Sequence, residues 1–410
     1  MNRKLQYIYN LFIAMIVSAL AVSCTDDELV KGGDKYEVVP DIPVALSLKI
    51  KVADQMEGQT RLAQSDETER TVNKLFVIAF KPSKQSDGAE NADASDDEWS
   101  VDNSAFYDTE DGLGNPIEVG KPQSVEFSMT TGLRRIYVVG NPQSGVGTLS
   151  DDELKNVKTI AALKALYSKL SDNLSVERVY FLMTGQAITK EKSEIVTVYK
   201  SGDHQGAIRE DYTMALNHVD ARITFNIIPA VGVTFEPEAY RVINIPGGTY
   251  LFSREKQNSG DNTWDYDGAG YAPSNRLSDF TEKDGKSIFE FYICENRQNP
   301  KQKISTESLL EEGTYYALRE KQEKKLITGT VEGQKYENGE YVYANAKSTY
   351  VELEGTITYK DDDGSEVYAK TTYTIHLGNT GNSNTADWLN DLELVNNYDT
   401  ERNTHYRGVL

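Results

Sequence analysis

The sequence holds few histidines and cysteines, and the separation of any carboxylate pair among its 64 Asp and Glu residues cannot be read from the sequence. None of its four histidines has a Cys, His or Glu partner at metal-ligand spacing; they are His204, His218, His376 and His405. No Walker loop, dinucleotide-binding glycine fingerprint or Gly-x-Ser-x-Gly elbow occurs in the chain. His218 and His376 stand in strand-like stretches, where a histidine is more often part of a face or core than a base. We therefore predict a protein that is not an enzyme and has no metal or other cofactor.

The acidic run from Asp361 to Gly364 could be mistaken for a calcium loop. An EF-hand loop needs flanking helices and a glutamate well downstream, whereas strand-like segments flank this run. A hairpin turn explains the Asp-Gly pair fully, so we expect a turn here and no metal site.

Cys24 is a candidate for covalent modification because of what precedes it. Arg3 and Lys4 come before an apolar run over residues 11–22, which is shorter than the about 20 residues of a membrane-spanning helix. The run ends in LAVSC, which resembles a bacterial lipobox. We predict that residues 1–23 are a lipoprotein signal peptide and that a lipid on Cys24 attaches the chain to a membrane. An uncleaved membrane helix and an ordinary signal peptide with an incidental cysteine are the alternatives.

If Cys24 is lipidated, the remaining cysteine, Cys294, has no partner for an intrachain disulfide. Its apolar surroundings predict a small core residue. Residues 24–43 are polar and contain two glycines and two prolines, which predicts a tether.

The polar, acidic loop after residue 52 is predicted to be cut by a protease, and it carries two arginines that are the candidate positions. Arg61 is the first choice, because it follows the preceding strand pattern closely. Arg70 is the second choice, because it abuts the next strand and leaves a protease less slack chain. The alternative is that both are ordinary loop arginines.

Two strand patterns flank this loop. The first alternates between apolar and mostly polar residues, which gives a strand one apolar face: Val44, Leu46, Leu48, Ile50 and Val52. The second is the continuous apolar run LFVIAF at 75–80, which suits a strand buried on both faces. We predict that the first strand is removable. After the loop is cut it leaves, and a strand of a neighbouring molecule takes its place.

The length, composition and net charge of the chain limit its fold class and the kinds of partner that it can bind. A chain of 410 residues is too long for one hydrophobic core, and its 39% hydrophobic and 10% aromatic residues are typical of globular proteins. The formal net charge of −21 repels phosphate backbones, which argues against nucleic-acid binding.

Most other apolar segments predict strands, and residues 81–120 predict a long surface insertion with a strand near 105–108. One convincing helix is predicted over 150–170, where Ser150 and Glu153 form a capping box. Many strands without a strand–helix alternation predict all-β sandwiches. We place one domain at 44–212 and the other at 213–410, just before the well-patterned strand at 214–228.

Several segments, in this order and spacing, resemble the fimbrillin family of Bacteroidales, which builds type V pili. The matching pieces are LAVSC at 20–24, Arg61, RRIYVVGNP at 134–142, LMTGQA at 182–187, LNHVDARITFNI at 216–227, GYAPSN at 270–275, FYICENR at 291–297, TIHLG at 374–378 and RNTHY at 402–406.

The resemblance implies two tandem transthyretin-like (Ig-like, Greek-key) β-sandwich domains, with the helix inserted in the first. It also implies export as a lipoprotein to the outer membrane and cell surface, and cleavage after an arginine by a trypsin-like surface protease. The freed groove would then take a strand from another fimbrial subunit, which is β-strand addition.

One departure concerns the end of the chain. In shaft subunits of the family, a full strand and a terminal donor segment follow the RNTHY-like motif, whereas only residues 407–410 follow it here. We expect either a truncated last strand or a subunit that accepts a strand without donating one, at an accessory or tip-like position. The alternative function is a surface lipoprotein that binds glycans through loop aromatics: Trp99, Trp264 and Tyr266.

Overall fold

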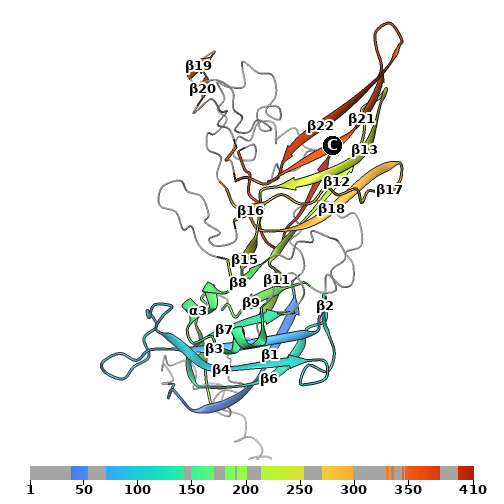
Figure 1. The fold of residues 1–410 in the computed structure, drawn as a ribbon. Coiled ribbons are helices and arrows are strands. Elements are labelled where there is room, and N and C mark those ends of the chain that lie inside the picture. The colour runs from blue at the N-terminus through green and yellow to red at the C-terminus, as the bar shows by residue number, and fades with distance from the viewer. Residues whose placement is uncertain are drawn as a thin grey trace, which may run out of the picture. The chain divides into compact units, whose positions relative to one another are not determined.

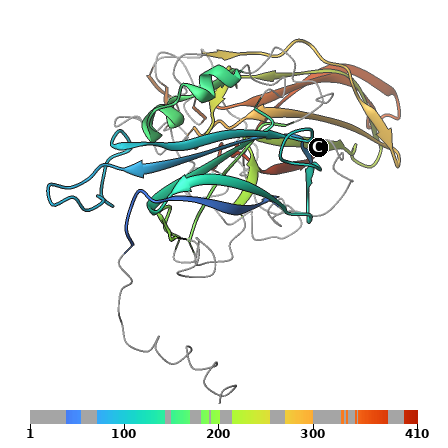
Figure 2. The same cartoon turned by 90° about the horizontal axis from the view of Figure 1, so that it is seen from below.

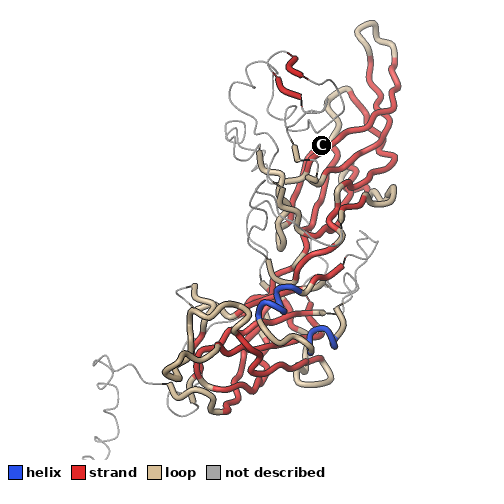
Figure 3. Tube along the Cα trace, turned by 60° about the vertical axis from the view of Figure 1, so that its left-hand side comes forward, coloured by secondary structure: helices blue, strands red, loops and turns tan. Residues whose placement is uncertain are grey.

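The structure, a computed structural model, describes residues 38–53, 71–142, 149–169, 181–189, 192–200, 214–253, 270–298, 329–331, 334–336, 344–345, 347–378 and 396–410. Strands make up most of these residues, and the described helices are two short segments (Figure 3). The all-β prediction is confirmed.

The first sheet is built from strands in the N-terminal part of the chain (Figure 1). Its members are β1 (Pro43–Val52), β3 (Lys74–Pro82), β4 (Trp99–Asp108), β6 (Gln123–Thr130), β7 (Gly132–Gly140), β9 (Met183–Gln186), β10 (Val196–Val198) and β11 (Met214–His218). The order is β4-β3-β7-β9-β11-β1-β6, and β10 pairs with β7.

This sheet folds back on itself, because its two end strands meet. The Asn103 side chain on β4 donates to the Ser128 carbonyl on β6 at 2.7 Å, and the Tyr107 hydroxyl donates to the Glu126 carbonyl at 2.7 Å. Apolar side chains from nearly every strand fill the space that is enclosed. The period of two in β1 and the burial of LFVIAF on both faces in β3 are confirmed.

The single helix predicted over 150–170 is wrong in its extent. The segment forms α2 (Asp151–Lys155), α3 (Ile160–Ala165) and the strand β8 (Tyr167–Lys169). The helix breaks because the Lys158 carbonyl accepts a hydrogen bond from the Val101 N–H at 3.1 Å, which ties this stretch to β4. Thr159 then caps α3. The capping box at Ser150 and Glu153 is confirmed.

Two further sheets enclose a separate apolar core. One contains β17 (Thr281–Lys283), β18 (Lys286–Cys294), β12 (Asp220–Ile227) and β23 (His405–Val409), in that order. The other contains β13 (Val233–Ile243), β21 (Tyr350–Lys360) and β22 (Glu366–His376). The Asp361–Gly364 run is the turn of the β21–β22 hairpin, as predicted. Cys294 is buried, as predicted for a core residue.

Four short ladders complete the described strands. They pair β2 (Thr71–Val72) with β5 (Ile117–Glu118), β8 with β15 (Gly248–Tyr250), β14 (Ile245–Pro246) with β16 (Tyr271–Ala272), and β19 (Gly329–Val331) with β20 (Gln334–Tyr336).

The chain passes from the first sheet to the second between β11 and β12. Asn403 holds the residues that connect β11 to β12. Its side chain accepts a hydrogen bond from the His218 N–H and donates one to the Asn217 side chain, each at 3.1 Å. Its own N–H donates to the Asp220 carbonyl at 2.8 Å. This gives the RNTHY segment a structural role. The domain border at 212/213 stays a prediction; β11, which follows it, belongs to the first sheet.

Candidate functional site

The strand predicted to be removable is β1, and its alternating residues lie on two different faces. Leu46, Leu48, Ile50 and Val52 are at most 5% exposed, and Val44 is half-buried against the same cluster. Between them, Ala45, Ser47 and Lys49 are exposed. The sequence pattern therefore places one apolar row in the core and one polar row in solvent.

β1 has a neighbour on each side. It pairs antiparallel with β6, from Pro43 opposite Thr130 to Ile50 opposite Gln123, and Figure 2 shows the dark blue β1 running beside that strand. Its last residues, 50–52, pair parallel with β11. Ala53 extends this second ladder with a 2.8 Å hydrogen bond to the Leu216 carbonyl. Without β1, the space between β6 and β11 would be a groove with unpaired backbone groups on both walls.

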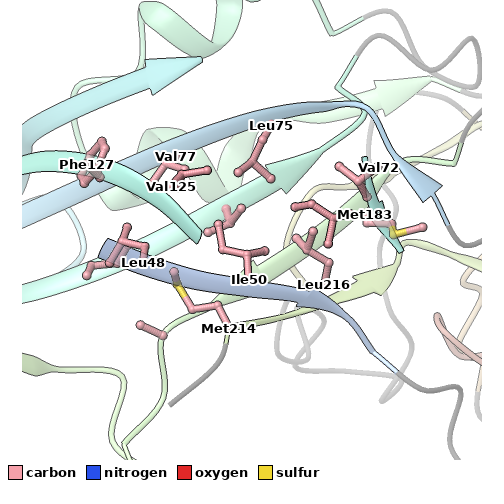
Figure 4. Packing of buried hydrophobic residues seen from close by; sticks show 14 of the residues in the cluster. Leu48, Ile50, Val72, Leu75, Val77, Val125, Phe127, Met183, Met214 and Leu216 are labelled. Atoms are coloured by element: carbon pink, nitrogen blue, oxygen red, sulfur yellow. The ribbon is translucent and has the colours of Figure 1, made fainter. Parts of the chain in front are cut away.

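The floor of that space is apolar. In Figure 4, Leu48 and Ile50 point from β1 toward Leu75 and Val77 on β3. Met214 and Leu216 of β11 belong to the same buried cluster. A strand that occupies this position must therefore offer apolar side chains at alternate residues.

Charged groups hold the start of β1. The two Asp41 carboxylate oxygens each lie 2.9 Å from an ammonium group, of Lys81 and of Lys84, and Arg134 Nη2 is 3.9 Å away. Hydrogen bonds from Lys84 and Lys81 hold the pKa of Asp41 at about 2, below its ordinary 3.8. The Asp41 N–H donates to the Thr131 carbonyl at 3.0 Å, so the pairing with the β6 side begins before the first residue of β1.

Arg134 is the centre of this charged cluster. Its side chain is fully buried, and it lies 2.9 Å from Glu90 and 3.2 Å from Asp102. It also donates to the carbonyls of Thr131 and Leu133, each at 2.6 Å. A buried guanidinium needs this many partners to offset the loss of water.

The far end of the predicted loop is fixed by Asn141. The Asn141 amide donates to the Thr71 carbonyl at 2.9 Å and to the Phe181 carbonyl at 3.0 Å, and its oxygen accepts from the Asn73 N–H at 3.0 Å. Asn141 has a φ of 51°, a left-handed conformation that asparagine tolerates better than most residues. The chain just after Arg70 is thus held in place.

Several predicted site residues lie outside the described residues. These are Cys24, Arg61 and Arg70, together with the loop aromatics Trp264 and Tyr266 and the histidine His204. Lipidation at Cys24 and cleavage at Arg61 or Arg70 therefore stay predictions.

Trp99 is not a loop aromatic, and the prediction that it could stack on a glycan is wrong. It begins β4 and is fully buried, and its indole N–H donates to the Ala94 carbonyl at 3.1 Å. The acidic residues around it predicted a surface insertion, but the strand pairs with β3 along its length.

The described histidines are packing residues. His218 and His376 are buried, as predicted. Burial, with Arg222 and Arg407 nearby, lowers the pKa of His405 to about 3, so its ring stays neutral. Among the residues that the structure describes, no group of three or more His, Cys, Asp or Glu side chains could hold a metal ion, and no helix is long and apolar enough to span a membrane.

Sequence reasoning missed the charged cluster at Asp41. Its members are far apart in the chain, and no periodicity connects them. The only signal was the pair Arg134-Arg135 within the RRIYVVGNP segment. A charged residue at the start of an apolar, strand-like run is expected to need a charged partner if it is buried, and this could have suggested the cluster.

Comparison with protein families gives a match over part of the chain. Residues 44–222 match the family described as the major fimbrial subunit protein (FimA). This confirms the resemblance predicted from the sequence, and a structural subunit is consistent with the prediction of a protein that is not an enzyme. A search of curated proteins found no match.

Solved structures of adhesion proteins are also similar. A candidate cell adhesion protein from Parabacteroides distasonis is 15% identical over 88% of each chain, with a TM-score of 0.43. Another from that species is 16% identical over 83% of this chain and 85% of its own, with a TM-score of 0.42. A third, from Bacteroides eggerthii, is 15% identical over 82% of this chain and 81% of its own, with a TM-score of 0.38.

Proposed function

Because residues 44–222 match the major fimbrial subunit family, we propose that this protein is a subunit of a cell-surface fimbria that receives a β-strand from a neighbouring molecule. In this proposal β1 occupies the receiving groove of the precursor. An arginine-specific surface protease cuts the chain after β1, the strand leaves, and the strand of the next subunit replaces it.

The observation that carries the proposal is the position of β1 between β6 and β11. Its four buried side chains each contribute about 1.5–3 kcal/mol, or roughly 6–12 kcal/mol together. That range is comparable with the whole net stability of a typical domain, about 5–15 kcal/mol. A molecule that has lost β1 therefore gains much by taking up another strand with the same alternation.

The groove also supplies the geometry of a specific contact. Each wall presents backbone groups that a new strand can pair with, and the apolar floor accepts only every second side chain. A slip by one residue would turn every apolar side chain toward solvent. An incoming strand is thus selected by its pattern as well as by its backbone.

The chain after β1 favours Arg61 over Arg70 as the cleavage site. Thr71, the residue after Arg70, pairs with Glu118, and its carbonyl accepts from Asn141. A protease must hold several residues around the cleaved bond in an extended form, and this pairing restrains the chain at Arg70. Arg61 is ten positions from Thr71 and leaves the protease more chain to bind.

The proposal includes export as a lipoprotein. A lipid on Cys24 would attach the precursor to the outer membrane, and cleavage at Arg61 would release the body from that anchor together with β1. Labelling of cells with an alkyne analogue of palmitate tests this part. The label should appear on the full-length protein, and it should be absent from the Cys24→Ala variant and from assembled subunits.

Assembly tests the main proposal. Purified full-length protein is mixed with the other subunits of its fimbria, because this chain need not donate a strand itself. The mixture is treated with an arginine-specific protease, and oligomers that contain this chain are followed by native gel and electron microscopy. We expect ladders of oligomers from wild type and from Arg70→Ala, and monomers from Arg61→Ala. Ladders that form equally without protease would contradict the proposal, because β1 would then not block the groove.

A further inference from the structure

We propose that the groove of β1 ends in a carboxylate-binding subsite, formed by Lys81, Lys84 and Arg134, that fixes the register of the incoming strand. The inference rests on the proposed function, since it concerns the molecule after β1 has left. It adds a chemical requirement for the partner: a negative group at one fixed end of an alternating apolar segment.

The cations of this subsite do not belong to the strand that leaves. Lys81 lies in β3, Lys84 follows the end of β3, and Arg134 lies in β7. Only the carboxylate that they share, that of Asp41, comes from the N-terminal segment, two residues before β1 begins. When this segment leaves, the three cations stay on the body of the subunit.

The departure changes the charge balance of the cluster. With Asp41 in place, three cations face three carboxylates, because Arg134 also pairs with Glu90 and Asp102. Without it, three cations face two carboxylates. The buried guanidinium keeps its own partners, whereas Lys81 and Lys84 lose the carboxylate that they bind together. One unbalanced positive charge then lies at the end of an apolar groove.

The position of this charge relative to the groove sets a spacing. The Asp41 N–H donates to the Thr131 carbonyl at 3.0 Å, and the Thr131 N–H donates to the Ile42 carbonyl at 2.9 Å, so Asp41 lies in register with the ladder of β6. Leu46, the first deeply buried residue of β1, follows five positions later. A strand with a carboxylate at this spacing satisfies the cations and the apolar floor together, whereas a slipped strand cannot satisfy both.

The incoming carboxylate could come from two sources. A strand that runs in the direction of β1 would offer an Asp or Glu side chain five residues before its first buried position. A strand that runs in the opposite direction would end at the subsite and offer its terminal carboxylate. Both sources share the chemistry that the cations recognise, and peptides can distinguish them.

The test uses the full-length protein with a site for a sequence-specific protease inserted within residues 54–70. The cut protein is challenged with fluorescent peptides of residues 40–53 that have blocked ends, carrying Asp41 or the Asp41→Asn change. A third peptide has the reversed sequence and a free terminal carboxylate, and a fourth is its amide. Bound peptide is measured by fluorescence anisotropy at low and at high salt.

We expect the Asp41 peptide to bind about three- to tenfold more tightly than the Asn peptide, as is typical of a few partly exposed ion pairs. The preference should shrink in high salt and disappear on the Lys81→Gln/Lys84→Gln protein. Lys370→Gln, which removes an exposed lysine of β22, should leave it unchanged. The single variant Lys84→Gln is measured as well. Because Lys84 is more exposed than Lys81, its replacement tests the subsite even if the double variant misfolds.

The outcomes separate the subsite from strand exchange. Equal binding of the Asp and Asn peptides to wild type, with neither reversed peptide preferred, overturns the subsite but leaves the proposed function standing. A preference for the reversed free acid over its amide supports the subsite with a chain terminus as its ligand. If no peptide replaces β1, the proposed function fails, and this inference fails with it.

Discussion

Ile50 should contribute most to holding β1 in its groove. It is the position of β1 that pairs with both neighbours, opposite Gln123 on β6 and Met214 on β11, and it is fully buried. Replacement by alanine leaves a cavity that paired strands on both sides cannot close. We therefore expect Ile50→Ala to lower the free energy of unfolding by about 2–5 kcal/mol. Lys49→Ala, the neighbouring change on the exposed face, should stay within about 0.5 kcal/mol of wild type.

Two assays report this difference. Guanidinium unfolding of the intact chain can be followed by the fluorescence of the buried Trp99, which packs in the core on the other face of β3. In the cut chain, the release rate of a labelled β1 should rise at least about 30-fold for Ile50→Ala, at tenfold per 1.4 kcal/mol. The release rate for Lys49→Ala should stay close to that of wild type.

Equal effects of the two changes would refute this reasoning. The alternation would then not decide which face of β1 is held, and the strand would be bound by its backbone alone. No effect of Ile50→Ala in either assay would show that β1 does not occupy the groove in solution.

Three further changes test the surroundings of the groove. Asn141→Ala should cost about 2–4 kcal/mol in urea unfolding, because it removes three hydrogen bonds to backbone groups, and Asn141→Gly should recover only the part due to the left-handed backbone. Gly185→Ala should lower stability by about 1–3 kcal/mol, since an added Cβ would lie 2.5 Å from the Ala215 carbonyl oxygen of β11; an unchanged melting temperature would argue against that close approach. Asp41 has a lowered pKa, so its advantage over Asp41→Asn should be complete above about pH 4 and be lost as the pH falls toward 2; a stability gap as large at pH 2 as at pH 6 would contradict the ion pairs.

The sequence predicts the strands whose signal is local. The alternation at 44–52 predicts one buried face, and the apolar run at 75–80 predicts burial on both faces. The structure agrees with both predictions. The apolar spacing at 150–170 is equally local, but it hides a break, where a hydrogen bond from β4 holds the Lys158 carbonyl. The local signals of this break are the C-cap Asn156 and the N-cap Thr159. The strand predicted near 105–108 is confirmed as part of β4, but its first half, which begins at Trp99, was missed because acidic residues surround it and pairing with β3 stabilises it.

The candidate site was predictable only in part. The apolar row of β1 can be predicted from its own residues. Its two neighbouring strands cannot, because the order of strands in a sheet has no signal in a sequence pattern. The cluster at Asp41 joins residues 41, 81, 84, 90, 102 and 134, which meet only because β3, β4 and β7 lie side by side. Long-range charge pairing of this kind has no periodic signal.

The most direct test of the account is the N-terminus of subunits taken from assembled fibres. Mass spectrometry and N-terminal sequencing of such subunits should find chains that begin at Leu62, without β1. Fibres whose subunits all begin before Pro43 and keep β1 joined to the body would contradict the central claim, because the groove would then still be filled by its own strand.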